Sequence, residues 1–193
     1  MINRLNKIKK KMKNNKKLER EFYVRDTIEI AKDLLGKYIV RKDGNKKIEG
    51  KIIETEAYIG PQDRASHAYK GKITKRNEAE YLIGGHIYIY LVYGMHWQLN
   101  ISTNKEGMPE CVLIRALDKG KIANGPGKVC HYLKLDKSFY GEDLTKSKRI
   151  WIEDRNEKIK ESDIKATKRI GIDYAGFYWS HRKWRFLLDN KNL

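Results

Sequence analysis

Glu54 and Glu56 lie two residues apart in the segment 47–58, where alternation over 51–58 predicts a β-strand. Side chains at positions i and i+2 of a strand project from the same face, so we expect the two carboxylates about 7 Å apart. Burial and mutual repulsion on such a face raise the pKa of at least one carboxylate, which suits general acid or base catalysis. By spacing alone, two structural carboxylates matched to lysine or arginine are the more frequent outcome.

Tyrosines are dense in and after this segment: Tyr58, Tyr88, Tyr90 and Tyr93. Tyr88 and Tyr90 share one face of a predicted strand, and Tyr93 falls in the predicted turn Tyr93-Gly94-Met95. Aromatic rings beside basic residues can stack on unpaired bases, typically worth about 1–3 kcal/mol per base. An aromatic ring at an exposed tip can also act as a wedge between base pairs. The alternative is a set of core tyrosines whose hydroxyl groups have hydrogen-bond partners.

The strand after this turn has a polar and an apolar face. Asn100 lies on the polar face, and so would project into a pocket beside the tyrosines. By itself, an asparagine in a strand is more often a local hydrogen-bonding residue. The segment Gly125-Pro126-Gly127-Lys128 predicts a helix start whose free backbone amides could hold a phosphate, although so short a motif is weak alone.

Motifs for metals and organic cofactors are missing from the sequence. The five histidines have no metal-ligand spacing, and no pair of cysteines accompanies them. A phosphate-binding P-loop and a dinucleotide fingerprint are also absent. We therefore expect neither a metal site nor a cofactor. Cys111 and Cys130 each lie among apolar residues, which predicts buried, reduced thiols.

The elements that must position these residues are strand hairpins interleaved with a few helices. The pattern predicts an α+β fold: a single domain with a mostly antiparallel, curved sheet, a protruding β-hairpin and surrounding helices. The predicted helices cover residues 26–36, 77–82 and 126–135, and the predicted strands cover residues 37–42, 47–58, 86–92, 96–103, 111–117, 149–153 and 184–188.

Charge is the strongest signal in the composition. Lysine and arginine exceed aspartate and glutamate by 17 in a chain of 193 residues. Such an excess favours a polyanionic partner, because each phosphate that the protein neutralises releases counterions. The alternative is that the lysines are ordinary surface residues without a specific partner. Residues 1–20 contain nine lysines or arginines against one acid, Glu19, which predicts a flexible basic arm before a single domain over 21–193. No apolar run is long enough for a membrane helix or a secretory signal.

Taken together, these segments resemble the alkyladenine (3-methyladenine) DNA glycosylase family. The resemblance covers about residues 22–188. The matching motifs are Glu54-Thr55-Glu56-Ala57-Tyr58 with Gly60-Pro61 and Asp63, His67, Arg76-Asn77, Tyr88-Ile89-Tyr90-Leu91-Val92-Tyr93-Gly94-Met95, Asn100-Ile101-Ser102, Val112-Leu113-Ile114-Arg115-Ala116-Leu117, Gly125-Pro126-Gly127-Lys128 and Arg169-Ile170-Gly171-Ile172. Lys75 and Lys183 stand where the family usually has proline, and His96-Trp97 follow Gly94-Met95 where other residues are common.

The resemblance implies a role for each matching residue. Catalysis is expected from Glu56, as the base that deprotonates water, and from Arg115, which positions the water or a phosphate. Tyr58, His67 and Tyr90 would enclose a flipped base, and Asn100 would exclude normal guanine. The DNA contacts would come from Tyr93, Met95, Lys128 and Arg76.

The resemblance also implies an activity: a monofunctional glycosylase of base-excision repair. It would flip alkylated or deaminated purines, namely 3-methyladenine, 7-methylguanine or hypoxanthine, out of double-stranded DNA and hydrolyse their N-glycosidic bonds. We expect a monomer in the cytoplasm, associated with the nucleoid and without membrane contact. Two alternatives stay open at this point: an inactive nucleic-acid-binding module, and a small-molecule enzyme on a related, formyl-transfer-like fold.

Overall fold

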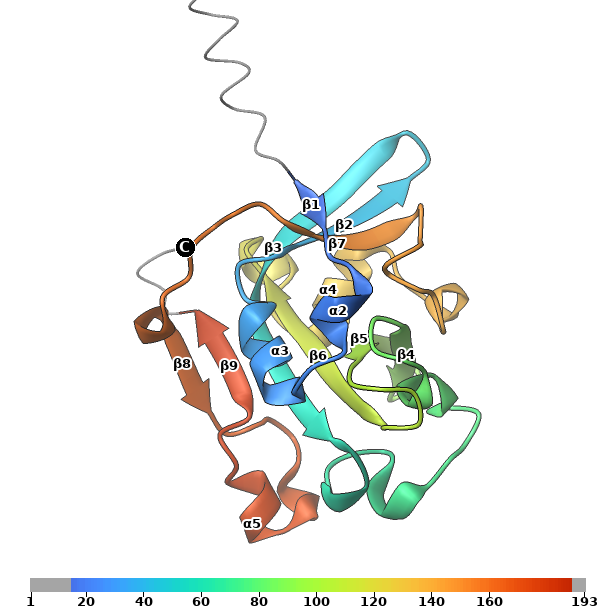
Figure 1. Ribbon diagram of the computed structural model, residues 1–193, viewed down its shortest axis with the longest axis vertical. Helices are drawn as coiled ribbons and strands as arrows, with labels where there is room; N and C mark the ends of the chain where they lie inside the picture. Colours follow the sequence, from blue (N-terminus) through green and yellow to red (C-terminus); the bar gives the residue numbers. More distant parts are fainter. Residues whose placement is uncertain (1–14, 189–193) are drawn as a thin grey trace, which may run out of the picture.

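A nine-stranded antiparallel sheet organises the computed structural model, which describes residues 15–188 (Figure 1). The main strand order is β1-β7-β2-β3-β6-β5-β4, and the β8–β9 hairpin joins the edge of β3 through β9. The sheet is open rather than closed on itself. Its strands are β1 (Lys16–Lys17), β2 (Tyr38–Asp43), β3 (Lys46–Ile59), β4 (Ile87–Val92), β5 (His96–Ser102), β6 (Glu110–Leu117), β7 (Ile150–Asp154), β8 (Ile164–Thr167) and β9 (Arg185–Leu188).

Short helices accompany the sheet, as predicted for an α+β domain. Residues 15–188 contain the α-helices α2 (Arg20–Tyr23), α3 (Thr27–Asp33), α4 (Pro126–Leu133) and α5 (Phe177–Ser180). The same residues contain the 3-10 helices η1 (Gly60–Gln62), η2 (Tyr69–Gly71), η3 (Glu78–Tyr81), η4 (Gly120–Ile122), η5 (Lys137–Phe139), η6 (Glu161–Asp163) and η7 (Asp173–Ala175). Over this described range, no helix has both the length and the apolar character needed to span a membrane.

The hydrophobic core lies between the sheet and helices α3 and α4. Ile30 of α3, Leu34 at the C-cap of α3 and Leu133 of α4 are fully buried in one cluster with strand residues such as Ile114. Asp26 caps α3, because its Oδ1 accepts hydrogen bonds from the backbone N–H groups of Ile28 and Glu29. The long strand β3 crosses this core and pairs with β6 on one edge and with β2 and then β9 on the other. In its second half, residues 54–56 therefore pair with β6 on one side and with β9 on the other.

Both predicted hairpins are present, and the sequence shows why. The β2–β3 turn contains Gly44 at φ 58°, a left-handed conformation that glycine adopts without steric cost. The β4–β5 hairpin closes over Tyr93-Gly94-Met95 and forms the end of the main strand path. The predicted strands over 111–117, 149–153 and 184–188 are also confirmed, each with its ends within one residue.

The structure corrects three local predictions. The flexible arm was predicted to reach residue 20, but residues 15–20 belong to the fold: β1 pairs with β7, and Leu18 is buried. The rest of the predicted arm lies outside the described residues. The predicted helix over 77–82 is the 3-10 helix η3. The third correction concerns β3, where register shifts in its pairing with β6 between Ile52 and Thr55 interrupt the regular alternation. Ile52 is therefore buried in the core, although alternation alone would place it on the same face as Glu54.

Candidate active site

A cavity of about 500 Å³ opens where strands β3 to β6 meet two loops. Its walls come from β3, the loop before η2, η3, the hairpin β4–β5, β6 and the segment between β8 and α5. The lining residues that carry polar or aromatic groups are Tyr58, His67, Arg76, Glu80, Tyr88, Tyr90, Tyr93, Gln98, Asn100, Cys111, Arg115 and Tyr174. Within residues 15–188, no group of three or more His, Cys, Asp or Glu side chains is arranged to hold a metal ion.

Glu56 lies directly behind one wall of this cavity and is fully buried. Its Oε1 accepts a hydrogen bond from the backbone N–H of Ile170 at 2.9 Å, and its Oε2 accepts one from the Tyr58 hydroxyl at 2.9 Å. Burial raises the pKa of the Glu56 carboxyl group, while Arg115 and these hydrogen bonds partly counteract the rise. Tyr58, Arg115 and Ile170 all line the cavity, so three partners of the carboxylate are part of the cavity wall.

Arg115 on β6 connects the two glutamates of β3. Its Nε donates to Glu54 at 2.9 Å, and its Nη1 lies 3.3 Å from the Glu56 carboxylate. Glu54 receives a second arginine, because Arg185 Nη1 on β9 donates to it at 2.8 Å. The two glutamates therefore differ: Glu54 is a structural carboxylate between two guanidinium groups, whereas Glu56 shares Arg115 and keeps an elevated pKa.

Aromatic rings line much of the cavity. The His67 and Tyr90 ring centroids lie 4.7 Å apart, edge to face, and Tyr90 lies 5.1 Å from Tyr88. His67 Nδ1 is hydrogen-bonded to the Tyr88 hydroxyl at 2.5 Å. Desolvation of the imidazole and the charges of nearby cations lower the pKa of His67, so its ring is neutral at neutral pH. Neutral rings facing a cavity of this size suit the stacking of a flat, aromatic ligand.

Asn100 lies in the interior of the cavity and is 1% exposed. Its side-chain Nδ2 donates only a long hydrogen bond of 3.3 Å to the Gln98 carbonyl, and its Oδ1 is 3.8 Å from Cys111 Sγ. Cys111 is a buried, free thiol, as predicted, and its Sγ lies 3.3 Å from Glu80 Oε1. One part of the cavity wall therefore carries an amide, a thiol and a carboxyl group side by side.

The tip of the β4–β5 hairpin carries an exposed tyrosine in an uncommon backbone conformation. Tyr93 has φ 51° and Gly94 has φ 69°, and Met95 N–H donates to the Val92 carbonyl at 3.1 Å, the pattern of a type I′ turn. The Tyr93 side chain is 88% exposed, and Met95 is also exposed. A bulky residue with positive φ is uncommon, and such local strain is concentrated at functional sites.

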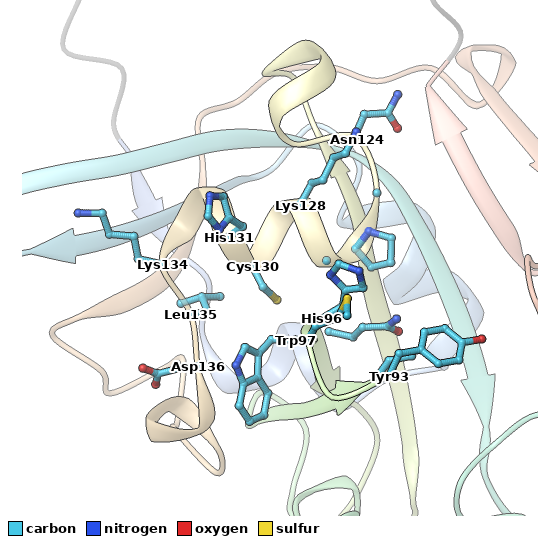
Figure 2. Close-up of a pocket in the computed structure, with 16 residues that line it drawn as sticks. Tyr93, His96, Trp97, Asn124, Lys128, Cys130, His131, Lys134, Leu135 and Asp136 are labelled. Carbon is cyan, nitrogen blue, oxygen red and sulfur yellow. The ribbon is translucent and has the colours of Figure 1, made fainter.

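A second cavity, of about 870 Å³, lies between this hairpin and α4 and adjoins the first cavity; we call it the groove. Figure 2 shows His96 and Trp97 of the hairpin beside α4, which contributes Lys128 and His131 to the groove. Tyr93 projects from the hairpin at the end of this groove. The approach of α4 is close, because a Cβ added at Gly127 would lie 3.2 Å from His96 Cβ. Gly127 therefore permits the close contact between α4 and His96, because it has no side chain.

Comparison with known proteins assigns the chain to a family. The methylpurine-DNA glycosylase family matches it over residues 21–121 and 118–192. The chain belongs to this family. A relative from Clostridioides difficile strain 630 is 43% identical over 204 residues, covering 89% of this chain and 100% of its own length. A relative from Clostridium novyi strain NT is 44% identical over 199 residues, covering 91% and 96%. Each relative is named as a candidate 3-methyladenine DNA glycosylase.

Membership in the methylpurine-DNA glycosylase family places the chain among DNA N-glycosylases, hydrolases of DNA repair. The structure brings most of the predicted site residues of this glycosylase together. Seven of them line one cavity, and Glu56 lies behind its wall. Met95 and Lys128 line the adjoining groove instead. The seven are Tyr58, His67, Arg76, Tyr90, Tyr93, Asn100 and Arg115.

Other residues of this glycosylase's site were not singled out from the sequence. Glu80 lines the cavity, and Ile170 both lines it and donates its backbone N–H to Glu56. Arg169 and Asp63 form an ion pair behind the same wall, and both side chains are fully buried. The residues Asp63 and Arg169-Ile170 do occur in the matching motifs, but nothing in a single sequence indicates that they meet. Glu80 carries no motif signal at all.

Proposed function

We propose that this glycosylase extrudes an alkylated or deaminated purine from double-stranded DNA and hydrolyses its N-glycosidic bond with water activated by Glu56. The observation that carries the proposal is the placement of one buried, raised-pKa carboxylate directly behind a cavity walled by aromatic rings. A volume of about 500 Å³ lies within the usual range for small-molecule sites and accommodates a purine.

Base extrusion costs a few kcal/mol of unstacking and unpairing, least for a damaged base. The exposed Tyr93 ring would offset part of this cost by entering the space that the base leaves. Tyr58, His67 and Tyr90 would then stack on the extruded base. Asn100, whose amide makes long contacts among the described residues, would act against normal guanine by clashing with its exocyclic amine. 7-Methylguanine has the same amine, but its positive charge weakens the glycosidic bond, so it would still be released.

Hydrolysis would proceed through positive charge on the sugar, as in other glycoside hydrolyses. An ionised Glu56 stabilises this charge and accepts a proton from the attacking water. Tyr58 and Ile170 N–H hold the carboxylate in place, and Arg115 supplies a cation beside the reacting water or phosphate. Among residues 15–188, those that line the cavity include no lysine, which favours simple hydrolysis without a Schiff-base lyase step. Trapping of a covalent DNA adduct with borohydride would contradict that.

The direct test is base release from duplex DNA that carries one hypoxanthine, and from methylated duplex DNA. We expect the free base to appear with both substrates, measured by chromatography or by cleavage at the resulting abasic site. A protein that binds the DNA but releases no base from either substrate would instead be an inactive binding module. A protein that does not bind duplex DNA would favour a small-molecule enzyme.

Replacement of the tip tyrosine, Tyr93→Ala, should weaken binding to lesion-containing duplex by about 1–3 kcal/mol, because one stacked ring is lost. The fold should be intact, since the side chain is 88% exposed. Titration of labelled duplex measures the affinity, and Tyr93→Phe is the matched control because it keeps the ring. Equal affinity of the alanine and phenylalanine variants would show that the wedge lies elsewhere.

Lys128, which lines the groove, gives a second prediction about DNA binding. Lys128 is exposed on α4 beside the hairpin tip, and we expect Lys128→Gln to reduce the slope of log affinity against log salt by about one. Lys165→Gln on β8, across the molecule from β4, is the matched control and should leave the slope unchanged (Figure 1). The same slope in both variants and the unaltered protein would remove Lys128 from the DNA contact.

The proposed substrate also suggests where and in what form the glycosylase works. The cavity, the adjoining groove and the exposed Tyr93 lie together within one protomer, and we propose that the glycosylase acts as a monomer. The relatives from Clostridioides difficile and Clostridium novyi are bacterial proteins, and bacterial chromosomal DNA lies in the cytoplasm. We therefore infer a cytoplasmic enzyme associated with the nucleoid.

A further inference from the structure

Glu80 of η3 is a second buried carboxyl group in the cavity, and no step proposed above uses it. Its side chain is 1% exposed and lines the cavity together with Tyr88 and Asn100. Oε1 is within 3.3 Å of the Cys111 thiol, whereas Oε2 has no hydrogen-bond partner among the described residues. A buried polar atom without a partner is destabilising, so one at a cavity wall marks a place where a bound molecule supplies the missing hydrogen bond.

The surroundings of Glu80 favour its protonated form. Burial raises the pKa of Glu80 to about 7, the Cys111 thiol and Asn77 amide counteract the rise, and the Asp63 carboxylate adds to it. Asp63 is itself paired with Arg169, and no lysine, arginine or histidine of residues 15–188 forms an ion pair with Glu80. The titratable groups that face Glu80 are Asp63 from the loop after η1, Tyr81 beside it on η3, Tyr88 and Tyr90 from β4, Cys111 from β6 and Tyr140 after η5.

We propose that Glu80 is the acid of this site for neutral purine lesions: its carboxyl group donates a proton from Oε2 to a ring nitrogen of the extruded base. The inference rests on the proposed function, and it assigns the two buried carboxyl groups opposite tasks. Glu56 acts on the water and the sugar, and Glu80 acts on the leaving base. A proton donor and a proton acceptor with separate environments are the usual arrangement for acid–base catalysis at neutral pH.

The Glu80 proton moves to a ring nitrogen of the base, the bond between the base and C1′ of the sugar breaks, and its electron pair stays on the purine. The purine leaves as a neutral molecule. The water oxygen bonds to C1′, and the water proton passes to the Glu56 carboxylate. Glu80 ends as a carboxylate and Glu56 as a carboxylic acid, and exchange with solvent restores both.

This role predicts a difference between two lesions. Hypoxanthine in DNA is neutral and leaves poorly without protonation, whereas 7-methylguanine already carries a positive charge and needs no acid. In Glu80→Gln, single-turnover release of hypoxanthine should fall about 100-fold, while release of 7-methylguanine should change by less than about 3-fold. The 7-methylguanine rate reports in the same preparation that the variant is folded. Glu78→Gln, an exposed position on the same η3 helix, is the matched control and should match the unaltered protein with both substrates.

The pH profile is the second readout, because a merely structural Glu80 would not alter it selectively. A protonated acid is required, so the hypoxanthine rate of the unaltered protein should decline as pH rises through about 7. That decline should be absent with 7-methylguanine and absent in Glu80→Gln. Equal losses with both lesions, or an unaltered hypoxanthine rate, would overturn the acid role while leaving the proposed function standing. Failure of the unaltered protein to release either base would overturn both.

Discussion

Glu56→Gln should lower the rate of base release by at least about 1,000-fold, because it removes both the proton acceptor and the negative charge opposite the developing cation. Glutamine keeps the shape of the side chain. Its amide oxygen can still accept the hydrogen bond from Ile170 N–H, and its NH2 group can donate to the Tyr58 hydroxyl oxygen in place of the hydrogen bond that Tyr58 now donates. We therefore expect the variant to bind lesion-containing DNA with near-normal affinity. Single-turnover release of 7-methylguanine measures the rate, and titration of the same duplex measures the binding.

The same residue sets an expected pH dependence. Burial raises the pKa of Glu56 above its ordinary value, and the base must be ionised to act, so activity should rise with pH through a midpoint higher than that of an ordinary glutamate. Any residual activity of Glu56→Gln should lack this rise. Glu54→Gln is the matched control on the same strand, and it should cost much less because the hydrogen-bond partners of the Glu54 carboxylate within residues 15–188 are two arginines. Near-normal release by Glu56→Gln would remove Glu56 from the role of base.

The parts of the fold that follow from local sequence were predictable. The β2–β3 and β4–β5 hairpins join neighbouring segments through short turns, so alternation and turn residues determine them together. The cap at Asp26 and the helix start at Pro126 are likewise local. The strands β1 and β8 were missed because they are short, at two and four residues. Each exists only through a partner strand, and β1 pairs with residues more than 130 positions away.

In the candidate site too, some features follow from local sequence and others depend on residues far apart in the chain. Tyr88, Tyr90 and Asn100 share one side of a hairpin, so their meeting at one cavity follows from strand periodicity. The distinction between Glu54 and Glu56 does not follow from periodicity, because it depends on Arg185 from β9 and on the Ile170 N–H. Glu80 was invisible for a related reason. A glutamate before Tyr81 in a charged segment has the pattern of a solvent-exposed residue, and only packing against β4 and β6 buries it.

Arg169→Met should be the most destabilising of the changes considered. Arg169 donates to both carboxylate oxygens of Asp63, at 2.9 Å for Nη2 to Oδ1, and to the Ala57 carbonyl at 3.0 Å. Both side chains of the pair are 0% exposed. Removal of the guanidinium leaves a buried carboxylate without its counter-charge, which typically costs about 3–5 kcal/mol. For a domain of this size, we expect the melting temperature to fall by about 6–20 °C.

The loss should extend to catalysis, because Arg169 also holds the cavity wall. Its guanidinium lies 4.7 Å from the centroid of the Tyr58 ring, and the next residue, Ile170, donates its N–H to Glu56. Thermal and urea unfolding measure the stability, and Arg64→Met, an exposed arginine next to Asp63, is the matched control that should be nearly neutral. Addition of Asp63→Asn to Arg169→Met should recover much of the stability, since the unpaired charge is then gone, without restoring the rate of base release. A double variant no more stable than Arg169→Met would show that packing of the arginine, rather than the ion pair, stabilises this wall.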